Sequence, residues 1–350
     1  MKLFEETLNS VGDLYEEAMS EARNRQKSLF KPPGSLGKLE TMSVQLAGIT
    51  GKVRNNLSKK LIIIMGADNG VIEEGVSVKR IETTASITKN IVAGGTGISV
   101  LARHAGSDLM VIDIGINADL HCPGIINKKI RYGTGNIMKG PAMTGEETIR
   151  AIETGIEAVF EASQKGYQLI GTGEAGIGNT TTSSAIFSLY AGTAIEDITG
   201  IGAGLSDEGI KRKIEVIKKS IELNHPDPSD PVDVLSKVGG LDIAGLVGCY
   251  LGCAARRIPV VIDGFISGVA ALMAIKLNKK TRNFMFPSHI SSEKGGKKLM
   301  EFLSMEPVVS TDMRLGEGTG CTMSFFILEG ACKIINEMFT CKEAVGQEQI

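Results

Sequence analysis

Short apolar runs alternate with helical patterns along most of the chain. Each run is β-prone, ends in a loop with glycine and an acidic or polar residue, and is followed by a helical pattern. Such units occupy residues 61–70, 109–119, 167–190, 258–277, 283–303 and 306–338. Continuous apolar strands that alternate with helices are typical of a parallel sheet covered on both faces. The sequence therefore predicts an α/β fold with a Rossmann-like parallel sheet in its large domain.

The two ends of the chain have a different pattern. Residues 1–30 are patterned as one or two amphipathic helices, and residues 330–350 as a helix with a polar tail. We expect 1–30 and 330–350 to pack together as a small helical domain. The parallel α/β domain then spans 31–329.

Polar residues follow the predicted strands. In open parallel sheets, ligands bind outside the carboxyl ends of the strands, and every loop of the six units leaves a strand at that end. We therefore expect one rim to collect Asp68, Asp113, Glu174, Asp263, Ser291 and Glu317.

The charge balance gives no reason to expect nucleic acid or an anionic membrane as a partner. The 350 residues include 38 basic and 40 acidic ones, a net charge of -2. The first residues are acidic and helix-patterned, unlike a signal peptide. No apolar stretch approaches the roughly 20 residues of a membrane span. We therefore expect a cytoplasmic protein that makes no membrane contact.

Cysteine and histidine spacing does not favour a metal site. Cys249 and Cys253 lie four residues apart in an apolar, helical run, where small buried side chains are a better interpretation than metal ligands. The chain has four histidines and no HxxxH or HExxH pattern, which makes a zinc hydrolase improbable. We expect neither a metal nor another cofactor.

The glycine-rich loop at 171–185 allows three interpretations. Gly171, Gly173 and Gly176 have GxGxxG spacing, and Glu196 follows 20 residues after the third glycine, as in a dinucleotide site. A structural turn is a second interpretation. A mononucleotide phosphate site is favoured, because Glu174 would repel a pyrophosphate and the segment after the helix is a poor second strand.

A phosphate requires only backbone N–H groups at a helix start, which two loops supply. The first provides Gly176, Gly178, Asn179 and Thr180. The second, at 200–213, provides Gly202 and Ala203 and is followed by Lys213. For this second loop, a solvated basic helix face is the alternative.

The loop at 311–321 offers a candidate general base. Glu317 has glycine on both sides, so a flat ligand can approach the backbone while the carboxylate stays clear of neighbouring side chains. The alternative is an acid placed at a helix N-terminus for its favourable interaction with the dipole.

Nine motifs in register resemble one known family. They are KPPGSLGKLE, GADNGV followed by EEGVS, AGGTGISVLAR, RYGTGN with PAMT, GEAGIGNTT, DPVDVLSKVGGLDIAG, IPVVIDGFIS, SHISSEKG and DMRLGEGTG. From about residue 25 to 335, the chain resembles the nicotinate-nucleotide–dimethylbenzimidazole phosphoribosyltransferases.

The resemblance implies a parallel-sheet domain, a small helical domain and a dimer. It also implies a reaction in which nicotinate mononucleotide and 5,6-dimethylbenzimidazole give α-ribazole 5′-phosphate and nicotinate, for cobamide (vitamin B12) assembly. Glu317 matches the family's general base, and Glu174 lines the same pocket. The further substrate-binding positions expected from the matching motifs are Asp263, Gly264, Ser291, Arg314 and Leu315.

Departures from the family pattern fall on the acceptor side. Arg80, Ser86 and Ile87 replace a proline, a glutamine and a methionine in the segment that lies against the acceptor ring, and Ala175 replaces a larger residue. This pattern resembles the branch that attaches ribose to phenol or p-cresol, whose enzymes work as paired paralogues. The acceptor is therefore expected to be an aromatic base or a phenol, and the assembly a homodimer or a heterodimer with a paralogue. The alternatives are a weakly active or non-catalytic paralogous subunit and, on GxGxxG alone, an NAD-dependent oxidoreductase.

Overall fold

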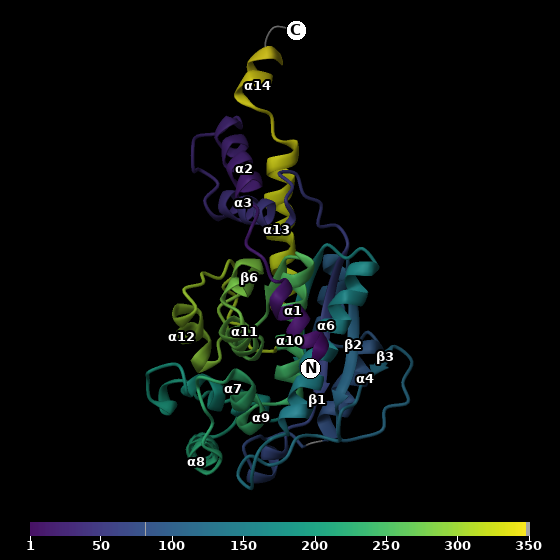
Figure 1. Cartoon of the computed structure of the whole chain (residues 1–350), viewed down its shortest axis with the longest axis vertical. Coiled ribbons are helices and arrows are strands. Elements are labelled where there is room, and N and C mark those ends of the chain that lie inside the picture. The colour runs from purple at the N-terminus through teal and green to yellow at the C-terminus, as the bar shows by residue number, and fades with distance from the viewer. Residues whose placement is uncertain (81, 348–350) are drawn as a thin grey trace.

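The computed structural model describes residues 1–80 and 82–347 and contains one sheet of six parallel strands (Figure 1). The strands are β1 Lys60–Ala67, β2 Ser107–Gly115, β3 Ile125–Asn127, β4 Leu169–Ala175, β5 Val260–Ile262 and β6 Met285–Pro287. Their order is β3-β2-β1-β4-β5-β6, so the direction of winding reverses between β1 and β4. The predicted α/β fold is confirmed. Ligands of such sheets bind at this reversal, beyond the carboxyl ends of the strands.

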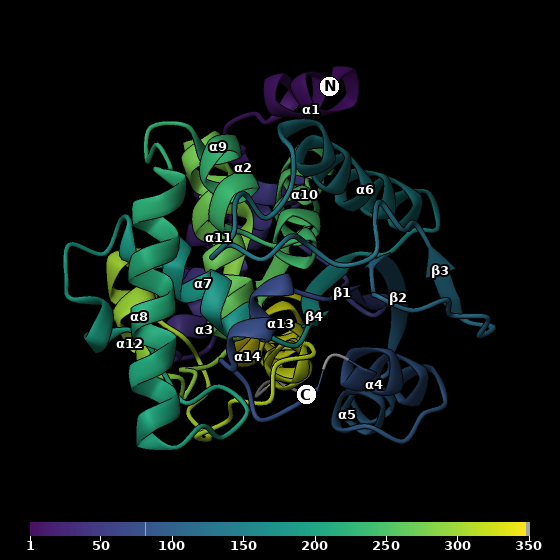
Figure 2. The same ribbon diagram turned by 90° about the horizontal axis from the view of Figure 1, so that it is seen from below.

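Helices cover both faces of the sheet because its central strand is apolar on both sides. Along β1, Leu61, Ile63 and Met65 face one core, whereas Ile62 and Ile64 face another. The first core includes α6 Gly145–Gln164, α10 Leu241–Arg256 and α11 Phe265–Leu277, and the second includes α3 Lys38–Thr50, α5 Gly97–Ala105 and α13 Thr319–Glu337. Figure 2 shows α6, α10 and α11 on one side of the strands and α4 Glu82–Val92 with α5 and α13 on the other.

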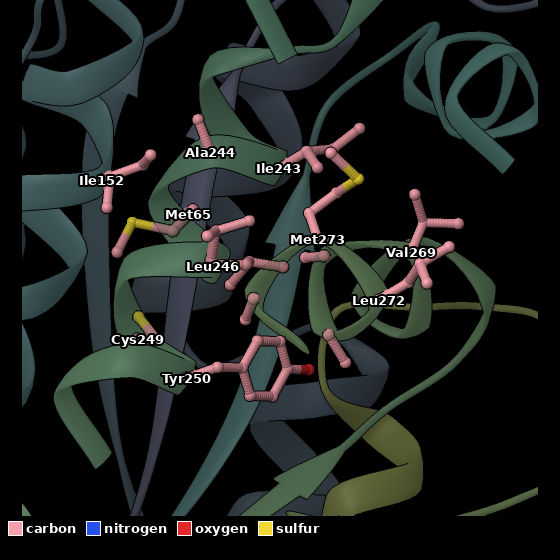
Figure 3. Packing of buried hydrophobic residues seen from close by; sticks show 14 of the residues in the cluster. Met65, Ile152, Ile243, Ala244, Leu246, Cys249, Tyr250, Val269, Leu272 and Met273 are labelled. Carbon is pink, nitrogen blue, oxygen red and sulfur yellow. The ribbon is translucent and has the colours of Figure 1, made fainter. Parts of the chain in front are cut away.

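The first core is closed by a tight helix crossing. A Cβ at Gly155 of α6 would overlap the carbonyl oxygen of Gly245 in α10, so only glycine permits this approach. In Figure 3, Tyr250 and Cys249 of α10 lie among side chains from β1, α6 and α11. Cys249 and Cys253 are buried in this core, as the apolar interpretation predicted.

The chain ends pack in two places. Helix α2 Glu16–Ser28 packs against α3 and α13, and Leu29 bridges Thr340 ahead of α14 Cys341–Gln347 (Figure 1). By contrast, α1 Lys2–Ser10 lies against α6 and α10. The proposed small domain of 1–30 and 330–350 therefore shares its contacts with α3, and its boundaries stay a prediction.

The sixth predicted unit begins differently from expectation. Residues 306–310, all of which the structure describes, contain no strand, and Val309 makes only an isolated bridge to His289. The sheet still has six strands, because a strand that the pattern did not predict, β3, follows the second unit. It has three residues and lies at the edge of the sheet.

The remaining elements are α7 Asn179–Ser188, α8 Asp207–Asn224, α9 Pro231–Val238, α12 Lys294–Phe302 and the short 3-10 helices Gly70–Glu74, Ile195–Asp197 and Lys279–Phe284. Within residues 1–80 and 82–347, no helix combines the length and apolarity needed to cross a membrane.

Candidate active site

A cavity of about 560 Å³ opens at the carboxyl ends of β4 and β5. Its lining comes from the segments at 76–87, 174–180, 202–203, 263–267, 289–293 and 314–317. The part nearest the sheet, here called the cavity floor, contains Glu174 and Ala175 at the end of β4 and Asp263 just after β5. The cavity therefore lies beside the reversal of winding, where the fold favours a ligand.

Glu317 occupies a strained loop at the start of α13. Its φ is 60°, and the flanking Gly316 and Gly318 also have positive φ, 82° and 92°. A non-glycine residue in this region costs about 1–3 kcal/mol, and such strain concentrates at functional sites. The buried carboxylate oxygen Oε2 has no hydrogen-bond partner within the described residues.

Burial and a neighbouring charge tune this carboxyl group. Burial raises the pKa of Glu317 to about 7, the negative charge of Asp263 adds to the rise, and the backbone N–H of Ile98 partly offsets it. A carboxyl group with this pKa changes its charge near neutral pH, as a general base should.

Asp263 holds the Glu317 loop in place. Its two carboxylate oxygens accept hydrogen bonds from the backbone N–H groups of Gly318 at 3.0 Å and Gly320 at 2.6 Å. These N–H groups belong to the first turn of α13, where an anion is favoured. The end of β5 thus anchors the loop that carries Glu317.

Glu174 faces the cavity from the end of β4. Its Oε2 accepts a hydrogen bond from Asn179 Nδ2, which also donates to Asp242 Oδ2 at 2.9 Å. Burial raises the pKa of Glu174 to about 8, and the charge of Asp242 contributes. The cavity therefore presents two carboxyl groups in different environments, the arrangement that separates acid and base roles.

The two predicted phosphate loops line the same cavity. Gly178, with φ 95°, precedes α7, so the backbone turns into the helix at a position that only glycine adopts readily. The wall here is formed by Gly176, Gly178, Asn179 and Thr180 of the first loop and Gly202 and Ala203 of the second. Free N–H groups at a helix start suit an anion.

Lys213 lies behind this wall rather than in it. The side chain is fully buried, and its Nζ donates to Thr180 Oγ1 at 2.8 Å and to the carbonyl oxygen of Gly200 at 3.4 Å. Burial lowers the pKa of Lys213 to about 8, while Glu293 opposes the shift. Lys213 thus joins the two phosphate loops to each other.

Gly264, Ser291, Arg314 and Leu315 also belong to the lining. Arg314 Nη1 donates to the carbonyl oxygen of Gly202 at 2.9 Å, linking the Glu317 loop to the second phosphate loop. The predicted convergence at the rim therefore holds for Glu174, Asp263, Ser291 and Glu317. Asp68, directly after β1, and Asp113, near the end of β2, lie at the same edge but outside the cavity lining. Asp113 pairs with Lys129 at 2.9 Å, and Asp68 accepts a hydrogen bond from the backbone N–H of Asn117.

Two acceptor-side residues lie elsewhere than expected. Arg80 and Ser86 are exposed and outside the cavity lining, whereas Lys79, Thr83 and Ile87 form part of the wall. Positions 83 and 87 of α4 lie one turn apart on the face toward the cavity. Ser86 is exposed on the same helix, and Arg80 is exposed ahead of its first turn. Ile87 and Ala175 therefore line the cavity as expected, and Arg80 and Ser86 do not.

The GxGxxG spacing has a packing explanation. Gly171 and Gly173 lie inside β4 and not in the turn after it, where the dinucleotide fingerprint requires them. A Cβ at Gly171 would crowd Cys321 of α13, so the missing side chains let α13 approach the sheet. Glu196, the expected ribose ligand of that alternative, pairs with Lys218 at 2.6 Å on the surface.

Sequence reasoning missed several lining residues. Ser267, His289 and Glu293 line the cavity, and Asp242 lies directly behind it. His289 and Glu293 fall within the SHISSEKG motif and Asp242 within GGLDIAG, so the motifs contained the signal although their chemistry assigned these residues no role.

Comparisons with known proteins agree over almost the entire chain. The sequence model of the Phosphoribosyltransferase family matches residues 11–345. The nicotinate-nucleotide–dimethylbenzimidazole phosphoribosyltransferase of Ruminiclostridium cellulolyticum is 54% identical over 341 residues, and that of Acetivibrio thermocellus 53% over 339; each match covers 97% of both chains. The crystal structure of CobT from Thermus thermophilus superposes with a TM-score of 0.90 at 36% identity, covering 94% of this chain and 98% of that one. The chain belongs to the nicotinate-nucleotide–dimethylbenzimidazole phosphoribosyltransferase family.

Membership in this phosphoribosyltransferase family confirms the resemblance carried by the nine motifs. It also confirms that the chain is an enzyme of the phosphoribosyltransferase class. The roles of individual cavity residues and the choice of acceptor lie beyond the comparisons and are proposed below.

Proposed function

We propose that the chain transfers ribose 5-phosphate from nicotinate mononucleotide to 5,6-dimethylbenzimidazole, giving α-ribazole 5′-phosphate and nicotinate for cobamide assembly. One observation carries the proposal: a glutamate poised to titrate near neutral pH shares a cavity with two glycine-rich helix starts suited to a phosphate. The names of the relatives support the same donor and acceptor.

The reaction is a displacement at C1 of the ribose. A nitrogen lone pair of the acceptor forms the new bond to C1, and the bond from C1 to the pyridinium nitrogen breaks with its electron pair, so the pyridine ring leaves uncharged. The acceptor's remaining N–H proton passes to the Glu317 carboxylate. Attack opposite the leaving group inverts the β donor to the α product.

The donor phosphate is assigned to the two phosphate loops. Backbone N–H groups near 176–180 and 202–203 bind it, Ser291 lies nearby, and Lys213 orders the loops from behind. Asp263 and Gly264 form the adjoining floor, and Arg314 and Leu315 close the cavity beside Glu317.

Replacement of Lys213 tests this assignment. In Lys213→Met, the apolar part of the side chain stays but the bond to Thr180 is lost. A hydrogen bond to a charged group contributes about 1.5–3 kcal/mol, so the KM for nicotinate mononucleotide should rise roughly tenfold or more. Steady-state kinetics with each substrate varied should show a smaller change in the KM of the acceptor.

Lys211→Met is the matched control, because Lys211 is exposed two residues earlier on the same helix. Its donor KM should equal that of the unaltered enzyme. An unchanged donor KM in Lys213→Met would remove Lys213 from the phosphate site.

A phenol such as p-cresol is proposed as a second acceptor. The wall made by Ala175, Ile87 and Thr83 provides an apolar surface with one hydroxyl group, and a phenol has a single oxygen where the benzimidazole has two ring nitrogens. With a phenol, the O–H proton passes to Glu317 in the same way.

Product analysis decides the acceptor. The purified chain, alone and with any paralogue encoded beside it, is incubated with nicotinate mononucleotide and an equimolar mixture of p-cresol and 5,6-dimethylbenzimidazole. Mass analysis should detect α-ribazole phosphate together with a phenolic riboside phosphate. Exclusive formation of α-ribazole phosphate would reject the phenol proposal, and no riboside phosphate of either kind would favour a non-catalytic paralogous subunit.

The active assembly is proposed to be a dimer, either of two copies or with a paralogue. The family resemblance supports this proposal. Light scattering on the purified chain, with and without the paralogue, measures whether a homodimer or a heterodimer assembles.

A further inference from the structure

One amide group connects a carboxyl group in the cavity to another that lies outside its lining. Asn179 Nδ2 donates to Glu174 Oε2 and, at 2.9 Å, to Asp242 Oδ2. Glu174 lines the cavity, whereas Asp242 is fully buried behind it. The nitrogen faces these oxygens, because the amide oxygen in that position would lie against the Asp242 carboxylate, which only accepts hydrogen bonds. Both amide protons are thus used to hold the two carboxyl groups.

Two glycines let the backbone approach the Asp242 carboxyl group closely. A Cβ at Gly240 would lie 2.6 Å from Asp242 Oδ1, and one at Gly176 would overlap Asp242 Oδ2. Asp242 lies in the first turn of α10, and the backbone N–H of Ile243 donates to its Oδ1 at 3.0 Å. This position favours the ionised form of Asp242.

Carboxyl groups have the largest electrostatic effects on Glu174, although Lys79, Arg314 and His289 line the same cavity. Asp242 on α10 has the largest electrostatic effect, followed by Asp263 after β5 and Glu317 ahead of α13, and Asp242 itself faces Asp68 after β1. Burial raises the pKa of Glu174 to about 8 and that of Asp242 to about 6, so Asp242 ionises first. The hydrogen bond from Ile243 and the position in the first turn of α10 favour the negative charge on Asp242, which leaves the proton to Glu174.

We propose that Asp242 is a positioning residue for the phosphoribosyl transfer: through Asn179 it fixes the Glu174 carboxyl group on the cavity floor and keeps it protonated. The inference rests on the proposed role of this cavity. It assigns different tasks to the two glutamates. Glu317 takes the acceptor's proton, and Glu174 offers a hydrogen-bond donor to the bound substrates instead of acting as a second base.

The pH dependence of kcat/KM tests the proposal. Activity should rise as Glu317 loses its proton and fall as Glu174 loses its own, which gives an alkaline limb. Asp242→Asn keeps the shape and an oxygen for Asn179 but removes the charge. A like charge within 4–6 Å shifts a pKa by about 1–3 units, so the alkaline limb should move down by roughly one unit or more. Glu174→Gln cannot ionise and should lack this limb.

Two further variants separate this mechanism from a merely structural role. The double variant Asp242→Asn with Glu174→Gln should have the profile of Glu174→Gln alone, because Asp242 acts through Glu174. Asp233→Asn makes the same change in the first turn of α9, where the carboxylate pairs with Lys237 at 2.9 Å, and should keep the original profile.

A folded, active Asp242→Asn enzyme with an unmoved alkaline limb overturns the proposal. If that variant does not fold, infrared spectroscopy of the unaltered protein decides: a protonated-carboxyl band at pH 7 that is absent in Glu174→Gln supports the proposal, and no such difference overturns it. If the unaltered protein transfers no ribose phosphate, the proposed function fails, and the infrared result still shows whether Glu174 holds a proton.

Discussion

Glu317→Gln is expected to fold normally and to lose roughly two to four orders of magnitude in kcat/KM, the contribution of one positioned general base. Glutamine keeps the shape of the side chain but cannot accept the acceptor's proton. Thermal unfolding should show a midpoint no lower than that of the unaltered enzyme. Burial raises the pKa of Glu317 above its value in the unfolded chain, so the ionised form opposes folding and glutamine removes that cost.

The matched control for this prediction is Glu337→Gln, an exposed glutamate at the far end of α13, the helix that follows the Glu317 loop. It should keep full activity. Near-normal turnover by Glu317→Gln would remove Glu317 from the role of base, whatever the control shows.

Gly173→Ala is expected to lower kcat/KM by roughly 100-fold, although residue 173 lies inside a strand and outside the cavity lining. A Cβ there would lie 2.5 Å from the backbone oxygen of Glu317 and 2.8 Å from the backbone nitrogen of Gly318. Both partners are backbone, and Asp263 anchors the loop, so the start of α13 must move. A displacement of about 1 Å at a catalytic group costs on the order of 100-fold in rate. The overpacking should also reduce the free energy of unfolding by about 1–3 kcal/mol.

Gly330→Ala tests whether any added methyl group has this effect. Gly330 lies within α13 with open space around its Cβ position, and alanine favours a helix interior by about 0.5–1 kcal/mol. Its activity should be unchanged and its thermal midpoint slightly higher. A Gly173→Ala enzyme with unaltered kcat/KM would show that the position of the Glu317 loop does not depend on this contact.

The strand-and-helix pattern predicted the sheet well because buried parallel strands are continuous apolar runs. The run at 61–65 became β1, with successive residues facing two cores. The pattern fails for very short apolar segments. Val308 and Val309 are apolar but form no strand, and the three-residue β3 is too short to recognise from sequence.

The cavity was partly predictable for a topological reason. Glu174 and Asp263 follow strands of one parallel sheet, so they had to share an edge, but that edge is wide. Asp113 lies within β2, on the far side of β1, and pairs with Lys129 instead. Ser291, Asp263 and Glu174 belong to β4–β6 on one side of the winding reversal, whereas Asp68 and Asp113 belong to β1 and β2 on the other side and lie outside the cavity lining.

Side-chain direction was the least predictable feature. Positions 80 and 86 depart from the family pattern, yet the phase of α4 turns 83 and 87 toward the cavity. Asp242 accepts a hydrogen bond from Asn179, which lies 63 residues earlier in the sequence. Only the Gly-Gly-Leu-Asp segment at the start of α10 indicates Asp242 in the sequence. Such a contact follows from the packing of α10 behind β4, which sequence spacing does not contain.

We propose that this one cavity binds donor and acceptor side by side, with Glu317 facing the acceptor. A crystal structure of Glu317→Gln with nicotinate mononucleotide and 5,6-dimethylbenzimidazole tests it most directly, because the slowed reaction preserves both substrates. The phosphate should contact backbone N–H groups near 176–180 or 202–204 with Ser291 nearby. The acceptor ring should lie against Ala175 and Ile87, with a ring nitrogen within hydrogen-bonding distance of residue 317. A phosphate bound at a different rim, or an acceptor ring remote from residue 317, would contradict the account.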